Sequence, residues 1–169
     1  MEFSVGESLK VISGGQTGVD RAALDAALNA GVPCGGWCPV GRRSEDGVIP
    51  ATYPLTELPG RGYLPRTRRN VLDSDGTLVL TFGPPSSGTA RTIEFCGTLK
   101  KPYLIIDGGT VAVAVAVGEV NEFLNQFDVR CLNVAGPRAS RSPQAYPYTY
   151  ALVSRVLAAA DPTTHSGEP

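Results

Sequence analysis

The sequence has few histidine and cysteine side chains, which are the usual ligands of zinc. It contains one histidine, His165, and four cysteines, of which only Cys34 and Cys38 lie close together in the sequence. A structural zinc site needs four ligands, and a catalytic site needs three ligands plus water. The sequence therefore predicts no protein-ligated metal, and we expect the cysteines to be reduced, buried thiols.

Long apolar runs and a strong charge of either sign are also lacking. No run of about 18 apolar residues is present, and no cationic stretch precedes an apolar segment near residue 1. We therefore expect a cytoplasmic protein that does not span a membrane. The formal net charge is −1, which makes nucleic acid an improbable partner. Twelve arginines accompany only three lysines. This bias is compatible with phosphate recognition, although an arginine-rich genome would also produce it.

Apolar runs alternate with helically spaced segments along the 169 residues. We predict strands at 9–12, 33–37, 77–82, 102–106 and 129–134, and helices at 19–30, 67–72, 89–99 and 112–126, with a last helix that begins at Pro143 or Pro147. Residues 38–65 read as a long loop with one short strand near 53–58. This alternation predicts an α/β fold whose mainly parallel sheet has helices on both faces. We expect residues 1–160 to form one domain and residues 161–169 a disordered tail.

Three polar loops, at 13–20, 83–89 and 135–141, follow predicted strands. Parallel strands carry such loops to the same edge of the sheet, where open α/β folds bind ligands. The first two loops are rich in glycine and precede helices, an arrangement typical of phosphate sites. The candidate ligand-binding residues are Gly14, Gly15, Gln16, Thr17, Gly18, Asp20, Ser87, Gly88, Thr89, Arg138 and Ser140. For some of them a structural role is an equal alternative, because Asp20 suits the helix dipole and Thr17 or Thr89 can cap a helix.

Four segments carry a resemblance to a known family. They are SGGQTGVDR at 13–21, RTRRNV with DSDGT at 66–77, SGT at 87–89 with Thr92, and LNVAGPRAS at 132–140 with Pro143 and Tyr146. In this order they resemble the family of putative molybdenum carrier proteins. The resemblance implies a three-layer Rossmann-like domain that holds molybdenum cofactor, a phosphorylated pterin, as its cargo. It also implies a homo-oligomer, either a tetramer or a dimer, and a carrier role that needs no catalytic residue.

The same resemblance leads to two alternatives within the wider Rossmann-like group. Phosphoribohydrolases of that group act on nucleoside monophosphates with a glutamate and an arginine, for which Glu94 with Arg66 or Arg69 are the candidates. Here Glu94 follows Thr89 by five residues instead of three, which departs from their loop. A weaker alternative is binding of single-stranded DNA, as in DNA-processing protein A, which the near-zero net charge opposes.

Overall fold

The computed structural model describes residues 9–159, which form a three-layer α/β fold of the Rossmann-like kind. A parallel sheet with the strand order β2-β1-β9-β7-β8 lies at the centre. Its strands are β1 (Lys10–Ile12), β2 (Cys34–Gly35), β7 (Gly76–Thr81), β8 (Tyr103–Asp107) and β9 (Cys131–Ala135). The predicted fold class is confirmed. The expected tail at 161–169 lies outside the described residues.

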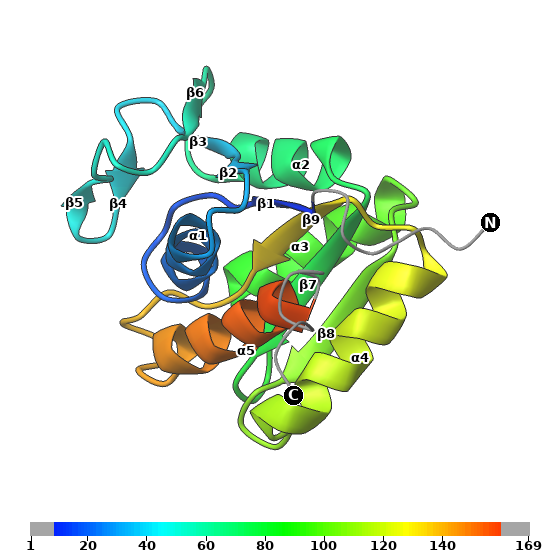
Figure 1. Cartoon of the computed structure of the whole chain (residues 1–169). Coiled ribbons are helices and arrows are strands. Elements are labelled where there is room, and N and C mark those ends of the chain that lie inside the picture. Colours follow the sequence, from blue (N-terminus) through cyan, green and yellow to red (C-terminus); the bar gives the residue numbers. More distant parts are fainter. Residues whose placement is uncertain (1–8, 160–169) are drawn as a thin grey trace.

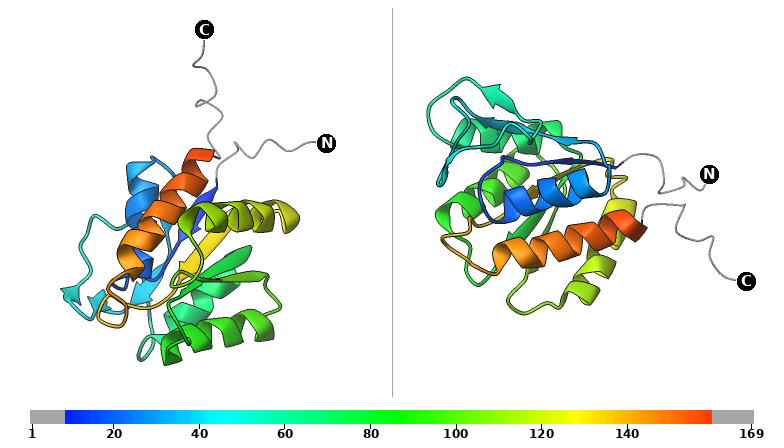
Figure 2. Two further views of the ribbon diagram at one scale, coloured as in Figure 1. Left: turned by 90° about the horizontal axis from the view of Figure 1, so that it is seen from below. Right: turned by 60° about the vertical axis from the view of Figure 1, so that its left-hand side comes forward.

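The helices form the two outer layers. They are α1 (Val19–Asn29), α2 (Leu64–Asp73), α3 (Ser87–Thr98), α4 (Val113–Gln126) and α5 (Ala145–Ala159). Helices α1, α4 and α5 cover one face of the sheet, with α5 packed against both of the others. Helices α2 and α3 lie together on the opposite face (Figures 1 and 2).

The main hydrophobic core lies between the sheet and the layer of α1, α4 and α5. Strand β7 is buried along its whole length, since all six of its residues are buried. Such continuous burial is expected of a parallel strand that is covered on both faces. On the core side, Leu78 and Leu80 of β7 pack with Val134 of β9 and with Val120 of α4. The core thus fixes the central strands, whose carboxyl ends support the polar loops.

The structure corrects the predicted strand at 33–37. Strand β2 ends at Gly35, and the chain then forms β3 (Trp37–Pro39), which pairs with β6 (Thr56–Leu58) in a separate small sheet. Gly36 causes the break because its φ of 129° favours glycine, and a Cβ there would lie 2.2 Å from the Ser13 carbonyl oxygen. Any side chain at this position would collide with the Ser13 backbone.

Two other segments differ from the prediction. The long loop contains, besides β3 and β6, a hairpin of β4 (Arg43–Ser44) and β5 (Gly47–Val48), which lies beside α1 (Figure 2). Helix α5 begins at Ala145 and not at Pro143 or Pro147. Pro147 is its third residue, where the missing N–H costs little because the first turn has no internal acceptor for it.

Candidate functional site

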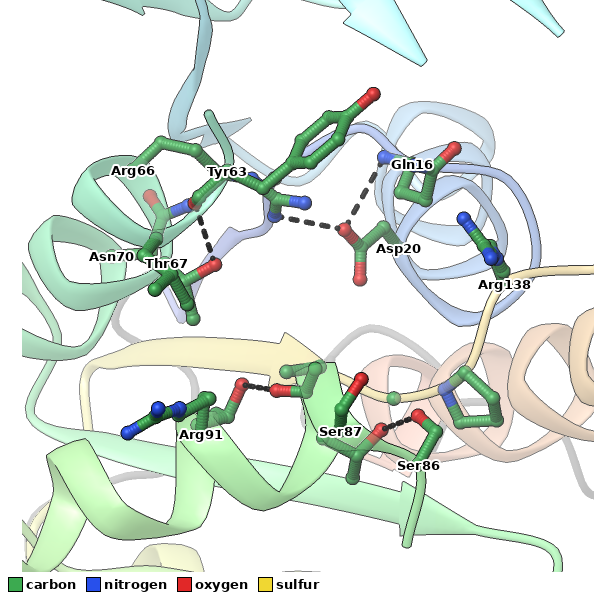
Figure 3. Close-up of a pocket in the computed structure, with 18 of the residues that line it drawn as sticks. Gln16, Asp20, Tyr63, Arg66, Thr67, Asn70, Ser86, Ser87, Arg91 and Arg138 are labelled. Atoms are coloured by element: carbon green, nitrogen blue, oxygen red, sulfur yellow. Dashed lines mark hydrogen bonds and ion pairs between the residues drawn. The ribbon is translucent and has the colours of Figure 1, made fainter. Parts of the chain in front are cut away.

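A cavity of about 430 Å³ lies between α2 and α3, above the carboxyl end of β9 (Figure 3). The loop before α1 and the loop after β9 close its other sides. Its lining residues are Gly14, Gln16, Asp20, Tyr63, Leu64, Arg66, Thr67, Asn70, Ser86, Ser87, Gly88, Thr89, Arg91, Thr92, Asn133, Val134, Ala135, Gly136, Pro137, Arg138 and Arg141. All three polar loops predicted from the sequence therefore reach one cavity, and its volume suits a nucleotide-sized ligand.

The amino terminus of α3 opens into this cavity with unused hydrogen-bond donors. Ser86 precedes the helix, but its hydroxyl lies 3.2 Å from the Thr89 hydroxyl and no side chain caps the helix. Within residues 9–159, the backbone N–H groups of Ser87, Gly88 and Thr89 have no acceptor. A Cβ placed on Gly88 would meet nothing within 4 Å, so the approach to these donors is open. Free N–H groups at a helix start favour an anion.

The amino terminus of α1 differs because several of its N–H donors already have acceptors. The Gln16 N–H donates to an oxygen of the Asp20 carboxylate at 3.2 Å, and the Thr17 N–H donates to the Gln16 side-chain oxygen at 3.1 Å. The Val19 N–H donates to the Pro137 carbonyl at 3.2 Å. The two glycine-rich loops are therefore not equivalent, because the first three N–H groups of α3 are all open whereas those of Val19 and Arg21 in α1 are already paired.

A buried ion pair forms the wall between α1 and α2. Arg66 Nη1 lies 3.4 Å from Asp20 Oδ2, and their side chains are 13% and 6% exposed (Figure 3). Burial raises the pKa of Asp20, and the Arg66 guanidinium offsets this only in part. The guanidinium lies directly over Gly14, where a Cβ would be 1.6 Å from Nη1. Arg66 Nε is buried without a hydrogen-bond partner among the described residues, so the pairing leaves part of this cation unsatisfied.

Three further arginines, Arg91, Arg138 and Arg141, reach the cavity from its rim. Arg91 is paired with Glu94 at 2.9 Å and Arg138 with Glu45 at 3.4 Å, whereas no ion pair of Arg141 occurs in the part of the chain that is described. Neither of those glutamates lines the cavity, and Asp20 is the only carboxylate among its described lining residues. The lining therefore has an excess of positive charge, which favours an anionic ligand.

The structure separates the sequence-predicted residues into two groups. Those that line the cavity are Gly14, Gln16, Asp20, Ser87, Gly88, Thr89 and Arg138, together with Arg66. Those that do not line it are Gly15, Thr17, Gly18, Ser140, Arg69 and Glu94. A Cβ added to Gly15 would meet the side chains of Leu55 and Ile49, and one added to Gly18 would meet the backbone of 137–139. The ligand-binding roles of both groups stay predictions.

The two hydrolase candidates outside the cavity have surface partners. Arg69 pairs with Asp73 at 2.9 Å and lies over the Trp37 ring, 5.0 Å from its centroid. Glu94 is half-exposed on α3, where it binds Arg91. Of the three residues considered for hydrolysis, only Arg66 contacts the cavity.

Sequence reasoning missed several lining residues, including Tyr63, Asn70 and Asn133. Asn133 was detectable in principle, because a polar residue stands in the middle of an apolar strand; it is 3% exposed and donates to the Thr77 hydroxyl at 3.3 Å. Tyr63 lies in the segment predicted as a loop, and Asn70 lies in the predicted helix at 67–72, for which no ligand contact was predicted. Asn70 has a structural role, since its amide exchanges two hydrogen bonds with the Trp37 backbone.

The fold and the cavity together define a Rossmann-like α/β protein with a cavity at the carboxyl edge of its parallel sheet, where open α/β folds bind ligands. Residues 11–157 match the model of the circularly permutated YpsA SLOG family, and the chain belongs to that family. A crystal structure of a putative molybdenum carrier protein from Syntrophus aciditrophicus is similar, with 45% sequence identity and a TM-score of 0.86. The match covers 89% of this chain and 94% of that one. The resemblance seen in the sequence is thus confirmed. Comparison with curated proteins yields no match.

The described helices and acidic, histidine and cysteine side chains bear on membrane and metal binding. None of the helices within residues 9–159 is long and apolar enough to cross a bilayer. The same residues contain no group of three or more histidine, cysteine or acidic side chains that could hold a metal ion.

Proposed function

We propose that the chain is a binding protein for a phosphorylated pterin or nucleotide, held in the cavity between α2 and α3. The observation that carries this proposal is the open amino terminus of α3. Its three unpartnered N–H groups lie beside a rim of arginines, and Gly88 leaves room for a phosphate to approach. A phosphate at such a site gains both hydrogen bonds and the favourable helix dipole.

The rest of the cavity suits the ring of such a ligand. Tyr63 and Leu64 provide an aromatic and an apolar surface on the side of α2, and both are partly exposed. Asn133 lies at the floor, where its amide can pair with polar ring atoms. This combination of apolar walls and a few polar groups is typical of small-molecule sites.

Molybdenum cofactor is the ligand that we propose as cargo, following the description of the similar protein as a putative molybdenum carrier. The cavity fits the phosphate of that cofactor because open N–H donors and arginines meet there. Ser87, Gly88 and Arg138 would hold the phosphate, and Tyr63 would contact the pterin. The metal chemistry would belong to the cofactor, and the chain would only bind it. We further propose a homo-oligomer that acts in the cytoplasm.

Two aspartate substitutions of matched charge test the α3 site. Gly88→Asp places a carboxylate in the cavity, whereas Gly118→Asp places one on the exposed surface of α4, where a Cβ also meets nothing within 4 Å. Binding of guanosine monophosphate is measured by calorimetry, with guanosine as the unphosphorylated control. We expect Gly88→Asp to weaken monophosphate binding at least about a hundredfold. The new carboxylate lies where the ligand phosphate would bind, and the two negative charges repel each other. Gly118→Asp should bind as the unchanged protein does.

The proposal fails if guanosine binds as tightly as its monophosphate, or if both aspartate variants retain the original affinity. In a separate experiment, native mass spectrometry of protein purified from its own host identifies the bound cargo and gives the mass of the assembly. Release of free guanine during the calorimetric incubation would favour the hydrolase alternative. The structure gives that alternative less support, because Glu94 does not line the cavity.

A further inference from the structure

A second set of anion-binding donors lies beside the cavity, and a carboxylate of the chain itself fills it. This Glu45 cluster consists of Thr17, Glu45, Arg138 and Ser140. The Glu45 carboxylate accepts hydrogen bonds from the hydroxyls of Thr17 and Ser140 and from the Ser140 N–H at 3.2 Å. Arg138 Nε lies 3.4 Å from the same carboxylate. Four donors from two loops therefore surround one anionic group.

Contacts that do not involve Glu45 hold the Thr17 hydroxyl and the two loops together. The Thr17 hydroxyl accepts the Ala139 N–H at 3.1 Å, which joins the loop before α1 to the loop after β9. Gly18 packs against the same loop, so closely that a Cβ would lie 2.5 Å from the Pro137 carbonyl oxygen. Such a preorganised set of donors resembles the surroundings of a bound phosphate more than those of a surface ion pair.

Glu45 belongs to a segment with few apolar anchors. It lies in the turn between β4 and β5, a hairpin of two residues per strand whose Val48 is 72% exposed. Polar contacts hold the hairpin to α1, chiefly the pair of Arg21 with Asp46. Burial by itself would raise the pKa of Glu45, but hydrogen bonds from Ser140 and Thr17 outweigh it and lower that pKa. Glu45 therefore stays ionised at neutral pH and competes with any other anion for these donors.

Arg138 connects this cluster with the cavity, since its side chain lines the cavity and also contacts Glu45. Gln16 does the same, because it lines the cavity and its side-chain oxygen accepts the Glu45 N–H at 3.0 Å. We propose that the donors around Glu45 form a second oxyanion site, which takes the second phosphate of a diphosphate ligand when the hairpin moves aside. This inference rests on the proposed function, in which the first phosphate binds at α3.

Calorimetry with pyrophosphate and with inorganic phosphate tests the inference on the full chain. Glu45→Ala removes the competing carboxylate, and Glu119→Ala is the matched control, since it removes an exposed glutamate of α4 that does not line the cavity. We expect Glu45→Ala to bind pyrophosphate about tenfold more tightly than the unchanged protein does, because charge-assisted donors become free. Glu119→Ala should show no gain. Adding Ser140→Ala to Glu45→Ala should abolish most of the gain.

Glu45→Gln is a second variant in case Glu45→Ala disrupts the hairpin. Glutamine has a similar size but no charge, so this variant should still show part of the gain in pyrophosphate affinity. The inference is overturned if neither Glu45 variant binds pyrophosphate more tightly than Glu119→Ala does. To separate the two sites, inorganic phosphate binding is also measured for Glu45→Ala combined with Gly88→Asp, which blocks the α3 site. A gain from Glu45→Ala that persists there supports a separate second site, and a gain that disappears refutes it. If Gly88→Asp alone leaves phosphate affinity unchanged, the α3 site and the proposed function fail, whatever the Glu45 variants show.

Discussion

Gly18→Ala should destabilise the protein much more than Gly31→Ala, although both glycines have a positive φ. Their φ angles are 80° and 67°, and an alanine in such a conformation costs about 1–2 kcal/mol. At Gly31 a Cβ meets nothing within 4 Å. At Gly18 it would lie 2.5 Å from the Pro137 carbonyl oxygen and 2.7 Å from the Ala139 nitrogen. These are backbone atoms, so the loop after β9 has to shift, which adds about 1–3 kcal/mol.

We therefore expect a loss of about 2–5 kcal/mol for Gly18→Ala and about 1–2 kcal/mol for Gly31→Ala. In a domain of this size each kcal/mol lowers Tm by about 2–4 °C. Urea denaturation and thermal melting measure the difference. Gly18→Ala should also weaken guanosine monophosphate binding, because the displaced loop carries Arg138. Equal losses of stability in the two variants would refute the close approach of the loops, and with it the shape of the site.

Three further predictions concern helix α3, the alkaline limit and the core. Gly97→Ala, at an exposed site of α3 outside the cavity, should raise stability by up to about 1 kcal/mol in urea denaturation without changing phosphate binding. Burial, followed by the hydrogen bond and charge of Asp25, raises the pKa of Tyr53 to about 12. The pKa of Tyr53 is therefore higher in the folded than in the unfolded protein. Its contribution to the free energy of unfolding is present below about pH 10 and is lost as the pH rises towards 12. Tyr53→Phe should remove that part of the pH dependence in alkaline melting curves; an unchanged slope would contradict it. Leu80→Ala should cost about 2–5 kcal/mol and Leu28→Ala less than about 1 kcal/mol, because the first side chain is fully buried and the second is 41% exposed. Similar urea midpoints for the two variants would contradict the assigned core.

The order of the main strands and helices was predictable because apolar spacing is a local signal. The run at 77–82 became β7, and the helical spacing after Thr89 became most of α3. The prediction failed where long-range packing decides the local structure. Gly36 interrupts a strand because it passes Ser13, and α2 begins at Leu64, earlier than the periodicity of the sequence indicated.

The same division applies to the site. Glycine-rich loops after apolar strands indicated an anion site, and the structure brings Gly14 and Gly88 to one cavity. The sequence could not show that several donors of the first loop are already occupied while those at the start of α3 are open. That depends on the Asp20 side chain folding back onto Gln16 and on the Pro137 carbonyl reaching Val19 across the chain.

The sequence by itself determined the alternation of strands and helices, since burial on both faces of a parallel sheet requires continuous apolar runs between amphipathic helices. It also determined the family, through short motifs that lie far apart in the chain. Only the tertiary structure decided which charges meet. Arg66 pairs with Asp20 across 46 positions, and Ser140 binds Glu45 across 95. Those pairings arise from the packing of whole layers, which no local pattern of residues records.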